Sequence, residues 1–435
     1  MGLYTLSSFV QMFPLVSFGT LLNVELGFSA SEITFYYAAI FLPWNFRAFY
    51  GLISDSVPLF RSRRRVYMVI CYCFVSICFV IYGRCVETAA NAFLVGVMLN
   101  VFFSFSEAVL DAVAVDMVTL IPLEEDSHAG RMKRSTDIQS AGMTFRTIGS
   151  LLAIPIAGGL STVLDSRTMI CLTSVFPLMA VCICIFRVVE RQAQSETLHK
   201  RTMHFIAYLK TCAGERRFPS ELVATVKPVL LPSIFILLYA SSPSSNQAFS
   251  NFLFTSLPFS QVDYHAVSLC ATIGSLIGTL TYWKAFRSST NLRTGFVVSL
   301  VVSAFAACSR LLIIHGWQNL YFVCVDEALV NLAFRLTLMP VQVYASIAAS
   351  APDHLMFEGF IYGLFASIEN WGGTLSGVVS GLLADHMSLT VLVLVSASVS
   401  FVPLLALNLI QPPKISLAEK VDDEGSVQQR TDVPI

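Results

Sequence analysis

Charged residues are scarce in this sequence: Asp, Glu, Lys and Arg make up 13% of its 435 residues. A soluble globular domain averages about 25%, so the composition argues against a large soluble protein. The formal net charge of −1 gives no overall attraction to nucleic acid. An apolar surrounding is therefore expected for most of the chain.

Patterns that indicate catalysis or metal binding are also missing. The 11 cysteines sit almost entirely within apolar runs, without zinc-ligand spacing or the loop placement of a disulfide framework. No P-loop, Ser-His-Asp arrangement or Gly-x-Gly-x-x-Gly after a strand stands out. We therefore expect no enzyme, no cofactor and no metal, and a driving force from gradients or exchange.

Long apolar runs are abundant instead. A helix needs roughly 20 mostly apolar residues to cross a bilayer. This length assigns spans to residues 3–24, 33–54, 66–83, 92–121, 137–160, 168–186, 228–256, 264–283, 294–314, 317–345, 357–384 and 387–410. The fold class is predicted as all-α, a multi-pass membrane protein of about 12 transmembrane helices. No basic region precedes the first run, so we expect no cleavable targeting segment in this chain.

The basic residues orient the predicted helices. Of the 27 Lys and Arg residues, 21 fall in one set of loops and the tail, and only Arg84, Arg167 and Arg310 in the other set. The positive-inside rule places the first set on the cytosolic or equivalent side. The spans divide six and six around a basic segment, which is the outline of a major facilitator fold with a midplane site between two halves.

This division predicts four parts of the chain. They are an N-terminal six-helix bundle at 1–186, a cytosolic central loop at 187–227, a C-terminal six-helix bundle at 228–412 and a disordered cytosolic tail at 413–435. The tail is assigned by its polar composition without apolar periodicity.

Six charged residues fall deep inside predicted spans: Glu107, Asp111, Arg146, Glu327, Arg335 and Glu369. A charge at the bilayer centre costs about 2.5–3.5 kcal/mol, so we expect most of these side chains to line a shared cavity. Ion pairs that only lock helices together are the alternative. Glu107 and Asp111 share a helix face and repel when both are ionised. One of them would then hold a proton unless an arginine such as Arg146 lies close.

A second charged set is predicted near the inner surface as a gate. It consists of Arg47, Asp55, Arg64, Arg65 and Asp116. A carboxylate at a helix end, such as Asp55, can pair with arginines in one gate state and release them in the other. Arg47, about two turns above Asp55, can instead reach the cavity. For Arg61 and Arg63 a lipid-facing anchor is an equally good interpretation.

The polar stretch SSPSSN at 241–246 interrupts the seventh apolar run. A broken polar helix is tolerated in a membrane only where it lines protein or water. This stretch is a second candidate for the pathway, with a simple proline kink as the alternative.

Several motifs carry a family resemblance. Residues 43–55 read PWNFRAFYGLISD, and RRVY follows at 64–67. DIQS stands at 137–140, MPVQV at 339–343 and NWGG at 370–373. In these motifs the chain resembles the folate–biopterin transporter family, a branch of the major facilitator group. That family's first motif reads approximately PWxxKPxYGxxSD, so Arg47 and Ala48 depart from it.

The resemblance implies a secondary-active transporter of folate or pterin that works by alternating access around a charged midplane cavity. Asp111 or Glu107 would hold the pterin edge, and Arg146 and Arg335 the anionic tail. Glu369 and, within NWGG, Asn370 complete the candidate binding and coupling residues, and protons are the candidate coupling ion. Relatives in this family carry different cargo. Another small metabolite such as S-adenosylmethionine, or a solute sensor without transport, therefore stays open.

An intramembrane aspartyl protease is the rival from another class. The sequence lacks the paired YD and GxGD motifs of such enzymes, and Asp111 and Asp116 fall on one helix about 140° apart. This interpretation is disfavoured.

Overall fold

The computed structural model describes residues 1–28, 36–37, 39–60, 62–120, 128–188, 220–259, 261–287, 291–350 and 357–410. Within these ranges the chain is helical apart from turns and a single antiparallel bridge between Leu59 and Ser62. The predicted tail at 413–435 and most of the predicted central loop at 187–227 lie outside the described residues. The all-α prediction is confirmed for the part that is described.

The first group of helices contains the described residues of the six predicted spans up to residue 186. It contains α1 (Gly2–Met12), α2 (Leu15–Thr20), η1 (Leu21–Glu25), η2 (Leu42–Phe46), α4 (Arg47–Ser56), α5 (Arg65–Cys85), α6 (Ala89–Leu120), α7 (His128–Leu160), α8 (Ser166–Thr173) and α9 (Val175–Arg187). Asp165 begins α8 by accepting a hydrogen bond from the backbone N–H of Thr168 (3.1 Å), which satisfies one of the free donors of a helix start.

The second group of helices contains α11 (Ser220–Ala240), α12 (Asn246–Ser256), α13 (Gln261–Phe286), α14 (Leu292–Ile314), α15 (Leu320–Ala349), α16 (Glu358–His386), α17 (Leu389–Val399) and η4 (Val402–Leu409). The predicted break of the seventh span is confirmed, because α11 ends at Ala240 and α12 begins at Asn246. Helix α11 starts at Ser220 and therefore reaches into the predicted central loop.

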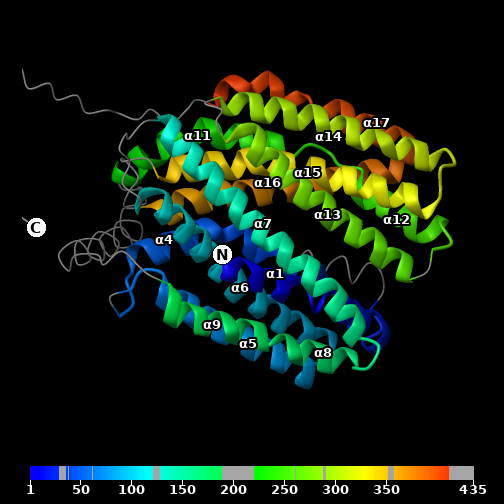
Figure 1. Cartoon of the computed structure of the whole chain (residues 1–435), viewed down its shortest axis with the longest axis horizontal. Helices are drawn as coiled ribbons and strands as arrows, with labels where there is room; N and C mark the ends of the chain where they lie inside the picture. The colour runs from blue at the N-terminus through cyan, green and yellow to red at the C-terminus, as the bar shows by residue number, and fades with distance from the viewer. Residues whose placement is uncertain are drawn as a thin grey trace, which may run out of the picture.

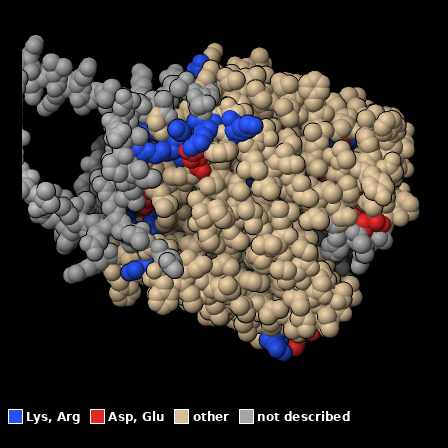
Figure 2. All heavy atoms as spheres, in the orientation of Figure 1, with Lys and Arg blue, Asp and Glu red and all other residues tan. Residues whose placement is uncertain are grey.

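Seven helices, or pairs of consecutive helices, among the described residues are long and apolar enough to cross a membrane. They lie at Arg65–Cys85, Ala89–Val118, Gly130–Leu160, Ser166–Phe186, Ala266–Phe286, Leu292–Ile314 and Leu389–Leu409. Figure 2 shows most of the visible Lys and Arg gathered at one end of the face, beside a broad band with few charged side chains. This distribution is typical of a protein surrounded by lipid.

Each group has its own apolar core. One core joins buried residues between Leu3 and Cys184, and the other joins residues between Val229 and Ile410 with Val115 and Met132. The two groups meet where α16 packs on α4 and α6, and where α7 packs on α13 and α15. In Figure 1 the first group fills the lower part and the second group the upper part, with α7 running diagonally between them.

Candidate functional site

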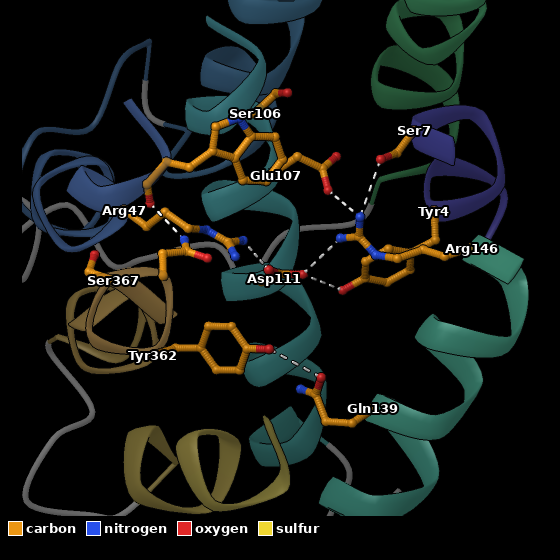
Figure 3. A network of polar contacts seen from close by, with 12 residues as sticks. Tyr4, Ser7, Arg47, Ser106, Glu107, Asp111, Gln139, Arg146, Tyr362 and Ser367 are labelled. Atoms are coloured by element: carbon orange, nitrogen blue, oxygen red, sulfur yellow. Dashed lines mark hydrogen bonds and ion pairs between the residues drawn. The ribbon is translucent and has the colours of Figure 1, made fainter. Parts of the chain in front are cut away.

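Asp111 is the centre of a buried ion network. Helix α4 brings Arg47 to Asp111 Oδ2, and helix α7 brings Arg146, whose Nη2 lies 3.3 Å from Oδ1. From α1 the hydroxyl of Tyr4 donates to Oδ1 (3.0 Å). Figure 3 shows these side chains converging from three helices on α6. We call Tyr4, Arg47, Glu107, Asp111 and Arg146 the central network.

Arg146 also pairs with Glu107, one helical turn from Asp111. Its Nη1 lies 2.5 Å from Glu107 Oε2, and the Glu107 side chain is completely buried. The predicted repulsion between Glu107 and Asp111 is thus met by an arginine between them, and Arg47 supplies a second positive charge. The positive charges of two guanidinium groups balance the negative charges of two carboxylates. This balance offsets the free-energy cost of burying each charge alone.

Hydrogen bonds connect the surroundings of the central network to α16 of the second group. The backbone N–H of Ala48 donates to Ser367 Oγ (3.0 Å). The hydroxyl of Tyr362 donates to Gln139 Oε1 (3.3 Å), and Figure 3 shows this pair below Asp111. A displacement of α16 would therefore break hydrogen bonds made by α4 and α7.

Arg335 and Glu369 form no close ion pair with the central network, although its charges act on both of them. Arg335 Nη1 approaches Met143 Sδ (3.4 Å). Within the described ranges, neither Arg335 nor Glu369 forms an ion pair closer than 4.0 Å. The structure thus joins Glu107, Asp111 and Arg146 of the predicted binding set. Arg335 and Glu369 attract each other only at longer range, and Glu369 also attracts Arg47.

A second ion cluster closes the basic end of the molecule. Asp55 Oδ1 lies 2.6 Å from Arg64 Nη2 and 3.0 Å from Arg63 Nη2, and Arg63 Nη2 also lies 2.9 Å from Glu358 Oε2. Arg64 Nε reaches Asp116 Oδ2 at 3.4 Å. Burial and the neighbouring arginine disfavour the charge of Arg63, but the carboxylates beside it outweigh both and raise its pKa. We call these five residues the inner cluster.

Not every predicted gate residue belongs to the inner cluster. Asp55, Arg64 and Asp116 do, and so does Arg63, for which the sequence left a lipid-facing anchor equally open. Arg47 is instead part of the central network, because its side chain extends toward Asp111 and away from the end of α4. Arg65 is exposed at the first residue of α5.

Asp55 joins the two groups of helices directly. Its Oδ2 accepts a hydrogen bond from the backbone N–H of Phe360 (2.8 Å), in the first turn of α16. A carboxylate is favoured there by the free N–H groups and by the helix dipole. Gly51 allows this approach, because a Cβ at Gly51 would collide with the carbonyl group of Gly359.

Replacing Gly51 by Ala is expected to destabilise the closed inner end and to slow uptake. Overpacking costs about 1–3 kcal/mol, which is about five- to 150-fold in the population of this state. Uptake into vesicles, normalised to the amount of protein, measures the effect. Gly158→Ala is the matched control, because a Cβ at Gly158 meets no atom within 4 Å. Equal uptake by both variants would contradict the role of this contact.

The basic-residue pattern predicts Arg310 in an outer loop, and this prediction is wrong. It lies within α14 with an exposed fraction of 3%. Its Nη2 lies 3.5 Å from Glu327 Oε1 and its Nε 3.9 Å from Asp326 Oδ2. Its Nη1 donates to Asn246 Oδ1 (2.6 Å), at the start of α12. The sequence signal was present, since two carboxylates in one apolar run require a partner.

Two cavities lie beside these clusters. Cavity 1, of about 630 Å³, lies between helices of the first group and α16, and cavity 2, of about 450 Å³, lies within the second group. Both are lined by Asn370 and Gly373, so they adjoin at α16. Glu369, Arg310 and the broken stretch 242–246 line cavity 2.

The central network lines neither of these two cavities. Trp44 connects it to cavity 1, because the Arg47 guanidinium carbon lies 5.7 Å from the centre of the Trp44 ring. The Trp44 carbonyl accepts a hydrogen bond from Asn370 Nδ2 (2.9 Å). Sequence reasoning named Trp44 only as part of a motif and missed this link, which depends on contacts between distant segments.

Comparisons with known proteins show the family to which the chain belongs. The model of the BT1 family matches residues 9–431. The chain is 24% identical to the folate-biopterin transporter of Synechocystis sp. over 419 residues, which cover 93% of this chain and 80% of that protein. It is 22% identical to folate transporter 2 of Plasmodium falciparum, over 85% of this chain and 77% of that protein.

These matches extend over nearly the whole chain. They confirm the resemblance predicted from the motifs and the prediction that the chain is not an enzyme. The chain therefore belongs to the BT1 family of membrane transporters.

Proposed function

We propose that the chain carries a folate- or pterin-type solute across a membrane by alternating access between two six-helix halves. The short or interrupted helices, such as α11 with α12, are proposed to cross the bilayer as well, along the apolar runs predicted from the sequence. Together with the long helices they give twelve spans. The halves would correspond to the two groups of helices. Their proposed boundaries are those predicted from the sequence, 1–186 and 228–412.

The observation that carries the proposal is the pair of adjoining cavities above a closed inner end. Asn370 and Gly373 of α16 line both cavities, and the first turn of the same helix is held to Asp55. A rocking motion that releases α16 from Asp55 would open the inner end and move the cavity walls together. That is the geometry that alternating access requires.

The ion clusters support a role in this motion. If a buried ion pair loses one partner, the charge that stays behind is costly. The inner cluster therefore favours a state in which all its ion pairs are formed or one in which all of them are separated. The central network keeps its four charges balanced between α4, α6 and α7. We assign the inner cluster to gating and the central network to the coupling of solute binding with helix movement.

Protons are the proposed coupling ion, with Glu369 as the site. Its carboxylate lines cavity 2 and forms no ion pair within 4.0 Å among the described residues. A carboxylate that faces a cavity without a fixed partner can exchange a proton with solvent.

Uptake by the purified chain in proteoliposomes tests the proposal. We expect labelled folate or biopterin to accumulate above empty liposomes, and accumulation to fall when an imposed pH gradient is collapsed. S-adenosylmethionine is compared in parallel. Accumulation of that compound alone would replace the proposed substrate, and binding of folate without net flux would identify a sensor.

A further inference from the structure

Asn45 is a buried amide without a partner. Its exposed fraction is 7%, and its side chain lines cavity 1. No hydrogen bond joins this side chain to any other residue that the structure describes. The amide oxygen and nitrogen touch the open space of the cavity, so an acceptor and a donor are available there to a ligand that enters it.

The walls of cavity 1 are aromatic and uncharged. None of its described lining residues carries a charge, and several of them are aromatic: Tyr36, Tyr37, Phe41, Trp44, Phe79 and Phe103. Its volume of about 630 Å³ is within the usual range of ligand pockets. Such walls favour a flat uncharged ring, which can pack against aromatic faces.

Two further amides of the cavity are already engaged by Trp44. Asn100 Oδ1 accepts from Trp44 Nε1 (3.0 Å), and Asn100 Nδ2 donates to the Gly96 carbonyl (3.0 Å). Asn370 Nδ2 donates to the Trp44 carbonyl (2.9 Å). They hold the indole in place. Two other lining amides, Asn45 and Gln11 of α1, keep both donor and acceptor available, and Asn45 is the more deeply buried of the two.

The central network cannot serve the same purpose in this state. Arg47, Arg146 and Tyr4 already occupy the Asp111 carboxylate. The expectation that Asp111 holds the ring edge therefore requires breaking ion pairs first. An amide offers a donor and an acceptor side by side without that cost.

We propose that cavity 1 binds the uncharged bicyclic ring of the transported solute and that Asn45 pairs with its amino-oxo edge. This inference rests on the proposed function and adds the ring subsite and a specificity residue. Trp44 then lies between the bound ring and Arg47.

Affinities measured on the purified full chain in lipid nanodiscs test this assignment. The probes are biopterin, which has the ring, and p-aminobenzoylglutamate, which has only the tail of a folate. Asn45→Ala should weaken biopterin binding by about tenfold or more, because two hydrogen bonds are lost. Binding of the tail fragment should stay the same, as should both affinities in the control Asn91→Ala, an exposed residue of α6.

Each result decides the matter. Unchanged biopterin binding by folded Asn45→Ala overturns the ring subsite and leaves the proposed function intact. If the unaltered chain binds neither folate nor biopterin, the proposed function fails and the subsite with it. Thermal unfolding and size exclusion check the fold of the variant. Asn45→Ser, which keeps a polar side chain, is measured in parallel and should show the same selective loss.

Discussion

Replacing Asp111 by Asn is expected to abolish uptake and to lower the stability of the protein. The change leaves Arg47 and Arg146 buried with only the Glu107 carboxylate between them, so one positive charge has no partner. Removing one member of a buried ion pair costs about 3–5 kcal/mol. Uptake in proteoliposomes should fall to the level of empty liposomes, and thermal unfolding should begin at a lower temperature.

A double replacement separates the structural part of this effect from the functional part. Arg47→Gln with Asp111→Asn removes one charge of each sign and restores the balance, so most of the lost stability should return. Uptake should stay at background, because the link from Trp44 through Arg47 to Asp111 is gone. Glu87→Gln, at an exposed carboxylate, should alter neither property. Full uptake by the double variant would show that the central network only holds the helices together and has no role in transport.

The parts of the molecule that sequence reasoning located are those set by local rules. Apolar run length located the helices, because the membrane requirement applies to each run by itself. The four-residue spacing of Glu107 and Asp111 placed both on one face of α6. The high cost of a buried charge then pointed to Arg146 as their partner, and the ion pairs have this geometry.

Other features depend on contacts between distant segments and have no local signal. Arg63 and Glu358 are 295 residues apart in sequence and form a hydrogen bond of 2.9 Å. No spacing rule connects such residues, and an arginine after a span is equally typical of a lipid anchor. Arg47 could likewise reach either end of its helix, and only the position of Asp111 on α6 determines its direction.

The same dependence on tertiary contacts explains the two cavities. Trp44, Asn100 and Asn370 come from η2, α6 and α16, and their mutual hydrogen bonds define one wall. A search for deep charges finds the central network but misses an uncharged cavity beside it. Candidate solute contacts therefore lie in cavity 1 as well as at the charges that the sequence marks.

A disulfide across the inner end is expected to stop transport reversibly. Ser135 of α7 and Ser346 of α15 are fully buried, and their hydroxyl oxygens lie 3.4 Å apart. With Ser135→Cys and Ser346→Cys together, the two sulfurs fall within reach of a bond. The oxidised protein would hold α7 and α15 together and keep the inner end closed. Uptake should drop by about tenfold or more, since the inward-open state becomes inaccessible.

Reduction should then restore uptake, which distinguishes a lock from a misfolded protein. Each single cysteine variant and the unaltered chain, treated with the same oxidant, control for the native cysteines. Solute binding should persist in the locked protein, because neither serine lines cavity 1 or cavity 2. Normal uptake by a fully cross-linked protein would mean that the solute crosses without separation of α7 from α15. The closed inner cluster would then be a permanent part of the fold, and alternating access between the two groups would be wrong.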